Sequence, residues 1–592
     1  MKQFFLTMAG VFAGLLLFFV VIPFVFITMA VASASSKEPT PARTVLELDL
    51  RDGITDQAPT NPFSIFGGSG LSTLQVVDAL AQAEDDDKVK GLLIRLPEGG
   101  LTPAAADEIR QAVNRFKAKG KPVIAHAQGF QPVGTAISSY MVGAAASELW
   151  MQNTSAFQLA GFSADSIFLG RAFDKYGVDA EFEQRYEYKN AVNEYTESDF
   201  TPAHREAMTA WMTSIYESSI ANAARDSNLQ PAALRATIEA GPYSSAQALQ
   251  LRLIDKVGQV EDAEKEIKRR AGDDAELMPL ADYASAKGER AGSGKAAIAI
   301  VGAEGAILTG EGGGGGFGGG SEIRSDDTAA AIYKAIEDDT VKAIVFRVSS
   351  PGGSPDASEQ ILAAVRAAKA AGKPVVVSMG DYAASGGYWI SSEASWIVAQ
   401  PTTLTGSIGV FGGKMVLAEA LGRFGVDMRN LTIGGEYADA FSPAKPFDPT
   451  DRAAFAAGID RTYDEFITRV STGRKLPAER VREIARGRVW TGAQAQGLGL
   501  VDQLGGLTEA IAKARELARI PAADSVRYKR YPEPQSAFEA LSKMFGVSTQ
   551  AAKVLIGIGG VMDDPQAEAA FRRVQTERAR ASGSSVLADQ PW

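Results

Sequence analysis

The sequence contains no cysteine and only two histidines, His126 and His204, among its 592 residues. These absences exclude thiol nucleophiles and cysteine metal sites, and they leave too few histidines for most metal centres. The chain also lacks a basic surplus, since 60 Lys and Arg stand against 71 Asp and Glu, giving a formal net charge of -11. A nucleic-acid-binding surface needs a basic patch. We therefore expect no metal and no nucleic acid, and any hydrolytic chemistry must use other residue types.

Charge is also absent from residues 4–34, FFLTMAGVFAGLLLFFVVIPFVFITMAVASA. This run is well beyond the roughly 20 residues that a membrane-spanning helix needs. A cleaved signal peptide is the alternative because AVASASS offers small residues, but the apolar part of such a peptide is only about 7–15 residues long. The length favours a membrane anchor within residues 1–36. The few flanking charges are consistent with a single pass that leaves the body outside the cytoplasm.

An internal repeat organises the rest of the chain. Residues 85–96, DDDKVKGLLIRL, match residues 337–348, EDDTVKAIVFRV, and residues 111–125, QAVNRFKAKGKPVIA, match residues 363–377, AAVRAAKAAGKPVVV. Each copy predicts a buried strand, an amphipathic helix ended by glycine, and a second buried strand. Further along, YGVDA matches FGVDM and AQALQLRLIDKVG matches AQAQGLGLVDQLG. Strands alternating with helices predict an α/β fold with mostly parallel sheets.

The repeat predicts five parts of the chain. They are a membrane anchor (1–36), a first copy (43–281), a small and polar linker (282–295), a second copy (296–520) and a carboxy-terminal extension (521–592).

A candidate nucleophile occurs in only one copy. The second copy reads GDYAASGGYW, with Ser385 before two glycines and a predicted helix start, whereas alignment puts Ile137 at this position in the first copy. Upstream, SPGGS ends a strand, so the backbone N–H groups near Gly352, Gly353 and Gly386 are candidates for an oxyanion hole. Such glycine pairs are more often simply tight turns.

A serine hydroxyl is a weak nucleophile until a base removes its proton, and a neutral lysine is a candidate base. Lys189, in RYEYKNAVNEY of the first copy, aligns with Tyr437 of the second copy. A Ser-Lys pair would therefore be divided between the copies. On residue type alone, a solvated surface lysine is the more common case, and several other serines are equally eligible as nucleophile: Ser349, Ser350, Ser354, Ser391 and Ser392.

From the anchor to about residue 520, the sequence resembles the long, two-copy form of signal peptide peptidase A. The matching motifs, in sequence order, are YKNAV, SPGGS, AASGGYW, TGSIGV and WTGAQAQGLGLVDQLGG. The resemblance implies Ser385 as nucleophile, Lys189 as general base and Ser407 as the residue that orients the lysine. Two departures, Ser349 for a usual asparagine and Asn190 after the lysine, concern the support of the oxyanion loop.

The resemblance also implies two tandem crotonase-like domains, related to caseinolytic protease, and a homo-oligomer, with a tetramer expected. The implied substrates are signal peptides and other unstructured hydrophobic segments, cleaved without a cofactor. The implied location is the bacterial inner membrane, with the catalytic body on the periplasmic side. For such chemistry, burial must lower the lysine pKa from about 10.4 so that a neutral amine exists.

Two other functions remain open on the sequence. A crotonase-type acyl-CoA enzyme would use similar paired N–H groups, although an anchor and a Ser-Lys pair argue against it. A membrane scaffold without catalysis is the other, and reaction of Ser385 with a fluorophosphonate would distinguish it from a peptidase.

Overall fold

The computed structural model contains a compact unit spanning residues 37–534. The structure describes Gly10, Gly14 and the ranges 39–58, 70–272, 274–288, 292–312, 321–521 and 523–532. Apart from those two glycines, the predicted anchor lies outside the described residues. No helix in the described part combines the length and apolar character needed to cross a bilayer.

The first copy contains a sheet of six parallel strands. Their order is β8-β4-β3-β2-β1-β9. The strands are β1 (Thr44–Asp49), β2 (Val89–Leu96), β3 (Val123–Ala127), β4 (Glu148–Met151), β8 (Lys256–Val257) and β9 (Glu276–Pro279). The central strands are apolar and buried on both faces, as expected for a parallel sheet covered by helices.

The second copy repeats this order. Its parallel path β19-β15-β14-β13-β10-β20 matches the first sheet strand for strand. The strands are β10 (Ala297–Glu304), β13 (Val341–Ser350), β14 (Val375–Ala384), β15 (Trp396–Ala399), β19 (Gln503–Leu504) and β20 (Arg527–Tyr531). Even the irregular register at the start of β1 recurs at the start of β10. The same topology thus occurs twice, as the repeat predicts.

Helices pack against each sheet. In the first copy they include α3 (Thr73–Ala83), α4 (Pro103–Ala118) and α5 (Ala136–Ala144); in the second they include α13 (Ser325–Glu337), α14 (Pro355–Ala370) and α15 (Gly386–Ser391). Of these, α5 and α15 are buried along their whole length. Each copy has its own large apolar core, and α4 also contacts β14 of the other copy. Each copy therefore has its own hydrophobic core, and the two copies pack against each other.

Two segments extend the copies beyond the bounds expected from the sequence. Helix α12 (Leu280–Lys287) occupies the first part of the predicted linker, and its Tyr283 is buried in the first core. Strand β20 lies in the predicted carboxy-terminal extension, yet it pairs with β10 at the edge of the second sheet. Its sequence, RYKRY, carries little apolar signal because this edge strand is only partly buried.

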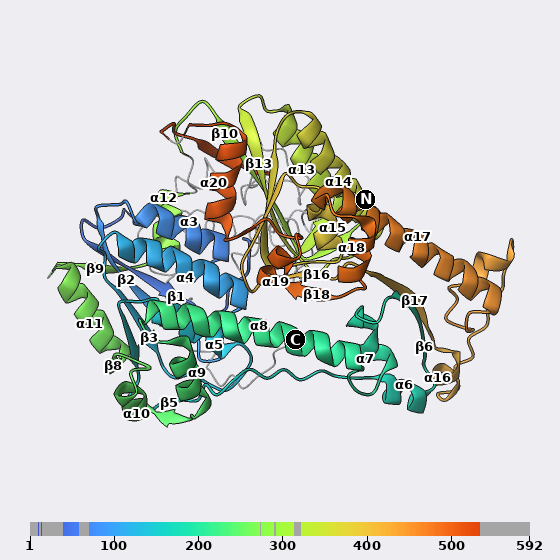
Figure 1. Ribbon diagram of the computed structural model, residues 1–592, viewed down its shortest axis with the longest axis horizontal. Helices are drawn as coiled ribbons and strands as arrows, with labels where there is room; N and C mark the ends of the chain where they lie inside the picture. The colour runs from blue at the N-terminus through green and yellow to red at the C-terminus, as the bar shows by residue number, and fades with distance from the viewer. Residues whose placement is uncertain are drawn as a thin grey trace. The chain divides into compact units, whose positions relative to one another are not determined.

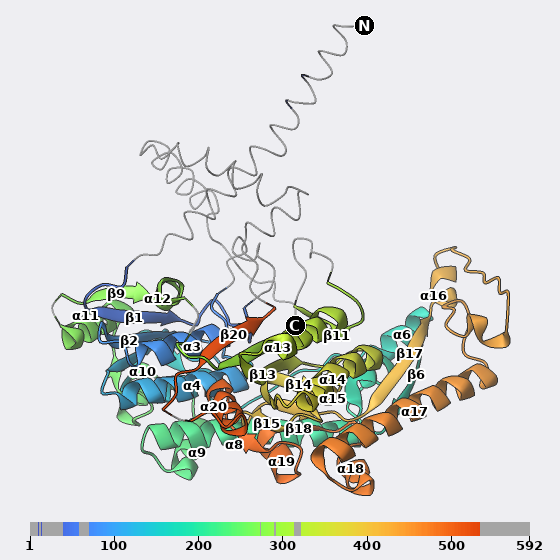
Figure 2. The ribbon, with the colours of Figure 1, turned by 90° about the horizontal axis from the view of Figure 1, so that it is seen from above.

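A small antiparallel sheet joins the two copies. Strand β6 (Asp179–Arg185) of the first copy pairs with β17 (Val410–Val416) of the second. Figures 1 and 2 both show these strands side by side, with helix α6 (Gly170–Tyr176) and helix α16 (Ala418–Gly422) near their far end. We refer to residues 162–189 and 410–437 as the first and second arms. Through this pairing, β6 leads the chain of the first copy toward the turn that contains Ser385.

Candidate active site

Ser385 lies in the sharp turn between β14 and α15. Its backbone has φ 54 and ψ -120, a region that non-glycine residues rarely adopt. The Ser385 N–H donates to the carbonyl of Gly406 at 2.9 Å, which holds the turn in place. Two glycines are needed after it because a Cβ on Gly386 would lie 2.7 Å from Ser358 Oγ, and one on Gly387 would lie 2.7 Å from the Ser350 carbonyl oxygen. The turn presents the hydroxyl at the helix start.

Lys189 reaches this turn from the first copy, four residues after β6. The N–H groups of Tyr186 and Tyr188 both donate to the Arg486 carbonyl, at 3.2 and 3.3 Å. Gly487 has φ +80, and a Cβ there would lie 2.6 Å from both the nitrogen and the Cβ of Lys189. The second copy therefore holds the lysine segment by strand pairing, two hydrogen bonds and one close glycine contact.

The ammonium group of Lys189 has three oxygen neighbours. Lys189 Nζ lies 3.1 Å from Ser385 Oγ, 2.9 Å from Ser407 Oγ and 3.0 Å from the Ser407 carbonyl oxygen. The residue is only 3% exposed. Burial lowers its pKa from the ordinary value of a lysine to about 7, because an apolar environment disfavours the charged form. A large fraction of this lysine is therefore neutral near pH 7, where it can accept a proton.

Ser407 is held in a specific backbone conformation. It has φ 48, follows Gly406 with φ 75, and its N–H donates to the Arg488 carbonyl at 2.7 Å. Its hydroxyl and carbonyl both face Lys189 Nζ. The structure thus brings Ser385, Lys189 and Ser407 together, although they come from distant parts of the sequence.

The three glycines predicted for the oxyanion hole lie beside Ser385, but they are not equivalent. The Gly352 N–H donates to Ser350 Oγ at 3.1 Å, so it is not directed at a substrate. The loop is fixed by Ile307, which donates to the Gly352 carbonyl and accepts from the Ser354 N–H. These two hydrogen bonds flank Gly353, so the Gly353 N–H points away from Ile307.

The N–H groups of Gly353 and Gly386 make no hydrogen bond to another described residue. A Cβ on Gly386 would lie 3.1 Å from the Gly353 nitrogen, so the two N–H groups are close neighbours. Gly352 contributes by allowing close approach, because a Cβ there would lie 2.6 Å from the Cβ of Ser385. The pair of N–H groups from Gly353 and Gly386 is suited to stabilise an oxyanion.

The other candidate serines have structural contacts. Ser350, Ser391 and Ser392 each donate their hydroxyl to a backbone carbonyl, and Ser354 caps the start of α14. Ser349 is buried, and its carbonyl accepts from the Gly305 N–H. Of the serines considered from the sequence, the described contacts join only Ser385 and Ser407 to Lys189.

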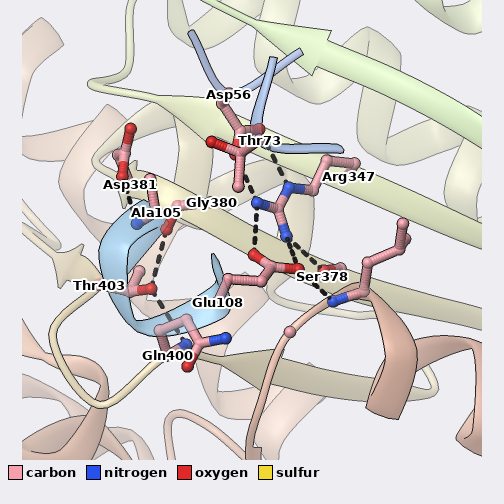
Figure 3. A network of polar contacts seen from close by, with 12 residues as sticks. Asp56, Thr73, Ala105, Glu108, Arg347, Ser378, Gly380, Asp381, Gln400 and Thr403 are labelled. Atoms are coloured by element: carbon pink, nitrogen blue, oxygen red, sulfur yellow. Dashed lines mark hydrogen bonds and ion pairs between the residues drawn. The ribbon is translucent and has the colours of Figure 1, made fainter. Parts of the chain in front are cut away.

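A buried charge cluster near the site was not anticipated from the sequence. Arg347 of β13 donates to Asp56 and Glu108 of the first copy and to Ser378 Oγ of β14, as Figure 3 shows. Asp381, four residues before Ser385, accepts from the Ala105 N–H. The sequence contains one signal for a buried charge here, because Arg347 directly follows the apolar residues AIVF of a predicted strand.

Comparison with known proteins identifies the class of enzyme. Residues 115–273 and 367–521 each match peptidase family S49, one match in each copy. The chain is 34% identical to Protease 4 of Salmonella typhi, over 86% of this chain and 83% of the relative. It is 34% identical to Protease 4 of Haemophilus influenzae, over 76% of this chain and 73% of the relative.

A plant relative extends the comparison. The chloroplastic serine protease SPPA of Arabidopsis thaliana is 27% identical over 88% of this chain and 76% of its own length. The chain belongs to peptidase family S49, and within that family it has the long, two-copy form. It is therefore a serine peptidase, which disfavours the acyl-CoA enzyme and the non-catalytic scaffold.

Proposed function

We propose that the protein is a membrane-anchored endopeptidase that cleaves signal peptides and other unstructured hydrophobic segments through a Ser-Lys dyad. The observation that supports this most directly is the 3.1 Å contact between Lys189 Nζ and Ser385 Oγ, made by a buried lysine with a pKa of about 7. Arrangements of this kind activate a serine without histidine.

In the proposed reaction, neutral Lys189 takes the hydroxyl proton of Ser385 while Oγ attacks the peptide carbonyl. The Gly353 and Gly386 N–H groups stabilise the negative charge that develops on the carbonyl oxygen. Protonated Lys189 then gives its proton to the leaving amine, which leaves an acyl-enzyme. A water molecule, deprotonated by the same lysine, hydrolyses the acyl-enzyme and restores the serine. Ser407 positions the amine throughout.

The proposal includes a bacterial inner-membrane location, with residues 4–34 as anchor and the body on the periplasmic side. The apolar run of the sequence supports the anchor. It also includes two crotonase-like domains, which the twofold parallel strand order supports. A homo-oligomer, expected to be a tetramer, is supported by exposed apolar side chains at the end of the second arm, including Phe424, which is 83% exposed.

The test is cleavage of a synthetic signal peptide by the purified full-length chain beside Ser385→Ala. We expect cleavage by the parent, none by the variant, and fluorophosphonate labelling of the parent at Ser385. A labelled Ser385→Ala protein, or a parent that cleaves neither signal peptides nor other apolar peptides, would contradict the proposed function. Alkaline phosphatase fused after residue 520 should be active if the body is exported.

A further inference from the structure

Residues 486–488 contact both residues 186–189, the lysine loop, and residues 406–408, the Ser407 turn. The Arg486 carbonyl accepts from two N–H groups of the lysine loop. The Arg488 carbonyl accepts from the Ser407 N–H at 2.7 Å. The backbone of this short segment therefore holds the loop of Lys189 on one side and the turn that faces its amine on the other.

The side chain of Arg488 makes the same connection a second time. Its guanidinium carbon lies 4.9 Å from the centre of the Tyr188 ring and 4.3 Å from the centre of the Trp490 ring. Tyr188 directly precedes Lys189 in the first copy, whereas Trp490 belongs to the second copy. A guanidinium is planar and stacks on aromatic faces, whereas the ammonium of a lysine is a compact point charge. One side chain thus packs against an aromatic ring from each copy.

Trp490 extends this contact to the Ser407 turn. Strand β18 (Val489–Thr491) pairs antiparallel with β16 (Leu404–Gly406). A Cβ on Gly406 would lie 2.8 Å from Cδ1 of the Trp490 ring, so the ring lies directly against the residue before Ser407. The contacts therefore run from the lysine loop through the guanidinium and the indole to the Ser407 turn.

The guanidinium of Arg488 has one described charged partner. Arg488 Nη2 lies 2.7 Å from Glu206 Oε1 in α8 (Pro202–Asp226), a helix of the first copy that lies beside β18 (Figures 1 and 2). The Glu206 side chain is 49% exposed, and ion pairs with an exposed partner are weak. The buried Nε of Arg488 has no hydrogen-bond partner among the described residues. The two aromatic rings are therefore the main constraint on the guanidinium.

We propose that Arg488 is a positioning residue for the dyad, and that its packing on Tyr188 and Trp490 sets the distance between the lysine loop and the Ser407 turn. Its side chain makes no described hydrogen bond to the dyad, so it acts through the loops that carry the reacting groups. This inference rests on the proposed Ser-Lys mechanism and adds to it a residue that the sequence did not single out.

Loss of this packing should affect Lys189 in two ways. The lysine loop can then move away from Ser385, and a displacement near 1 Å can cost about 10²-fold in rate. Movement also admits water to Nζ, which returns the pKa of Lys189 from about 7 toward the ordinary value of a lysine. A merely structural role for Arg488 would lower the melting temperature without moving the pH midpoint of activity. The pH midpoint therefore separates the two roles.

The test is Arg488→Lys in the full-length chain, which keeps a positive charge near Glu206 but removes the planar group. We expect kcat to fall about 10- to 100-fold, with little change in KM. The pH midpoint of activity should move upward by about one pH unit, because the lysine is less well buried. Peptide cleavage from pH 6 to 10 measures both effects, and thermal melting shows whether the fold is kept.

Arg235→Lys is the matched control. The guanidinium carbon of Arg235 lies 5.4 Å from the centre of the Tyr216 ring, and its Nε lies 2.7 Å from Glu239 Oε1. These contacts are of the same kind, but they involve neither the dyad nor its loops. Arg235→Lys should therefore keep the kcat and the pH midpoint of the parent.

A double-mutant cycle with Tyr188→Leu tests the route. Tyr188→Leu removes the ring but keeps the N–H that donates to the Arg486 carbonyl. This variant alone should also move the pH midpoint upward, which provides the test if Arg488→Lys proves unstable. Combined with Arg488→Lys, it should lower kcat hardly further, because both changes remove the same contact. Losses that multiply would show that the two residues act independently and would overturn the proposal.

The parent and Ser385→Ala are measured in the same assay. An active parent beside an Arg488→Lys variant with unchanged kcat, or with reduced kcat but an unchanged pH midpoint, overturns the positioning role alone. A parent without activity contradicts the peptidase proposal, and the positioning role with it.

Discussion

At the scale of single residues, the decisive feature is a lysine whose pKa is lowered by burial. Lys189 has a pKa of about 7 because its ammonium group is desolvated. A general base must be unprotonated, so its useful fraction increases with pH through this value. Activity should rise from pH 6, pass its half-maximal value near pH 7 and level off above about pH 8.

Lys189→Arg should abolish turnover while leaving the protein folded. Arginine keeps the positive charge but stays protonated, so it cannot accept the Ser385 proton. We expect a loss of about 10²- to 10⁴-fold, the usual contribution of a general base. Peptide cleavage from pH 6 to 10 and circular dichroism measure the two effects. Lys175→Arg, an exposed lysine of the same arm, is the control and should retain full activity.

Ser407→Ala should have a smaller effect. The variant removes the hydroxyl that accepts from Lys189 Nζ at 2.9 Å but keeps the backbone carbonyl at 3.0 Å. One net hydrogen bond contributes about 1 kcal/mol, so turnover should fall roughly 5-fold. Because Ser407 acts through the lysine, the pH midpoint of activity should also move. An unchanged pH profile together with a small loss would assign Ser407 a merely structural role.

From the sequence, Ser385 and Lys189 could be predicted as nucleophile and base only because the repeat and the family resemblance were considered together. Spacing alone could not show that residues 196 positions apart in the chain meet, since the contact depends on pairing between two copies. The individual oxyanion donors were less predictable. The N–H of Gly352 is used by the hydrogen bond to Ser350 Oγ, which leaves Gly353 as the candidate donor, and no sequence pattern encodes that bond.

At the scale of elements, the position of Lys189 depends on the close approach of its own loop to the loop that contains Gly487. Gly487→Ala would place a Cβ 2.6 Å from Lys189 backbone and side-chain atoms, at a φ of +80. The lysine segment must then move away from Ser385. A displacement near 1 Å can cost about 10²-fold in rate, so we expect a loss of that order in kcat without global unfolding.

Gly372→Ala separates this effect from backbone strain. Gly372 has a φ of +77, and a Cβ there would meet nothing within 4 Å. Both variants therefore carry the same conformational penalty, about 1 kcal/mol, but only Gly487→Ala should lose activity. Peptide cleavage and thermal melting of the two proteins provide the comparison, and equal activity in both would show that close approach at Gly487 is unimportant.

The elements that the sequence predicted best are those with strong periodic apolar patterns. Strands β2 and β13 and helices α4 and α14 match the repeat because each buries a continuous apolar face. Strand β20 was missed since an edge strand needs few apolar residues. The β6–β17 sheet was missed because both strands are partly polar and become partners only through the association of the copies.

At the scale of the whole molecule, the two copies are expected to be active only together. Residues 37–288 carry Lys189, and residues 292–592 carry Ser385, so neither part holds both members of the proposed dyad. Each part expressed alone should show no peptide cleavage above background, and coexpression should restore a measurable fraction. Cleavage by residues 292–592 alone at the full-length rate would show that the base lies within the second copy.

The junction between the copies contains more buried negative charge than its arginine neutralises. Arg347 is 1% exposed and contacts Asp56 and Glu108. Burial, assisted by the charge of Asp56, raises the pKa of Glu304 to about 7 and that of Asp381 to about 6. For both acids the folded state holds a proton that the unfolded state has released. Their contribution to stability is therefore largest below about pH 4 and is lost as pH rises through 6 and 7.

Arg347→Met should make this pH dependence visible. The variant leaves Asp56 and Glu108 buried without their cation, which costs about 3–5 kcal/mol for a buried pair broken on one side. The loss in free energy of unfolding should be greatest at pH 8. It should be smaller at pH 5.5, where protonation of Glu304 and Asp381 relieves their repulsion with Asp56. Denaturant unfolding at the two pH values measures this loss.

The repeat provides the control for this last experiment. Arg95 aligns with Arg347, but its guanidinium lies 3.6 Å from Glu47 in a partly exposed pair. Arg95→Met should therefore cost only about 0–1 kcal/mol at either pH. If both variants lose the same stability, or if the Arg347→Met loss does not shrink on acidification, the buried charges do not hold the copies together. If only Arg347→Met is strongly and pH-dependently destabilised, the buried charges around Arg347 stabilise the junction between the copies, as we expect.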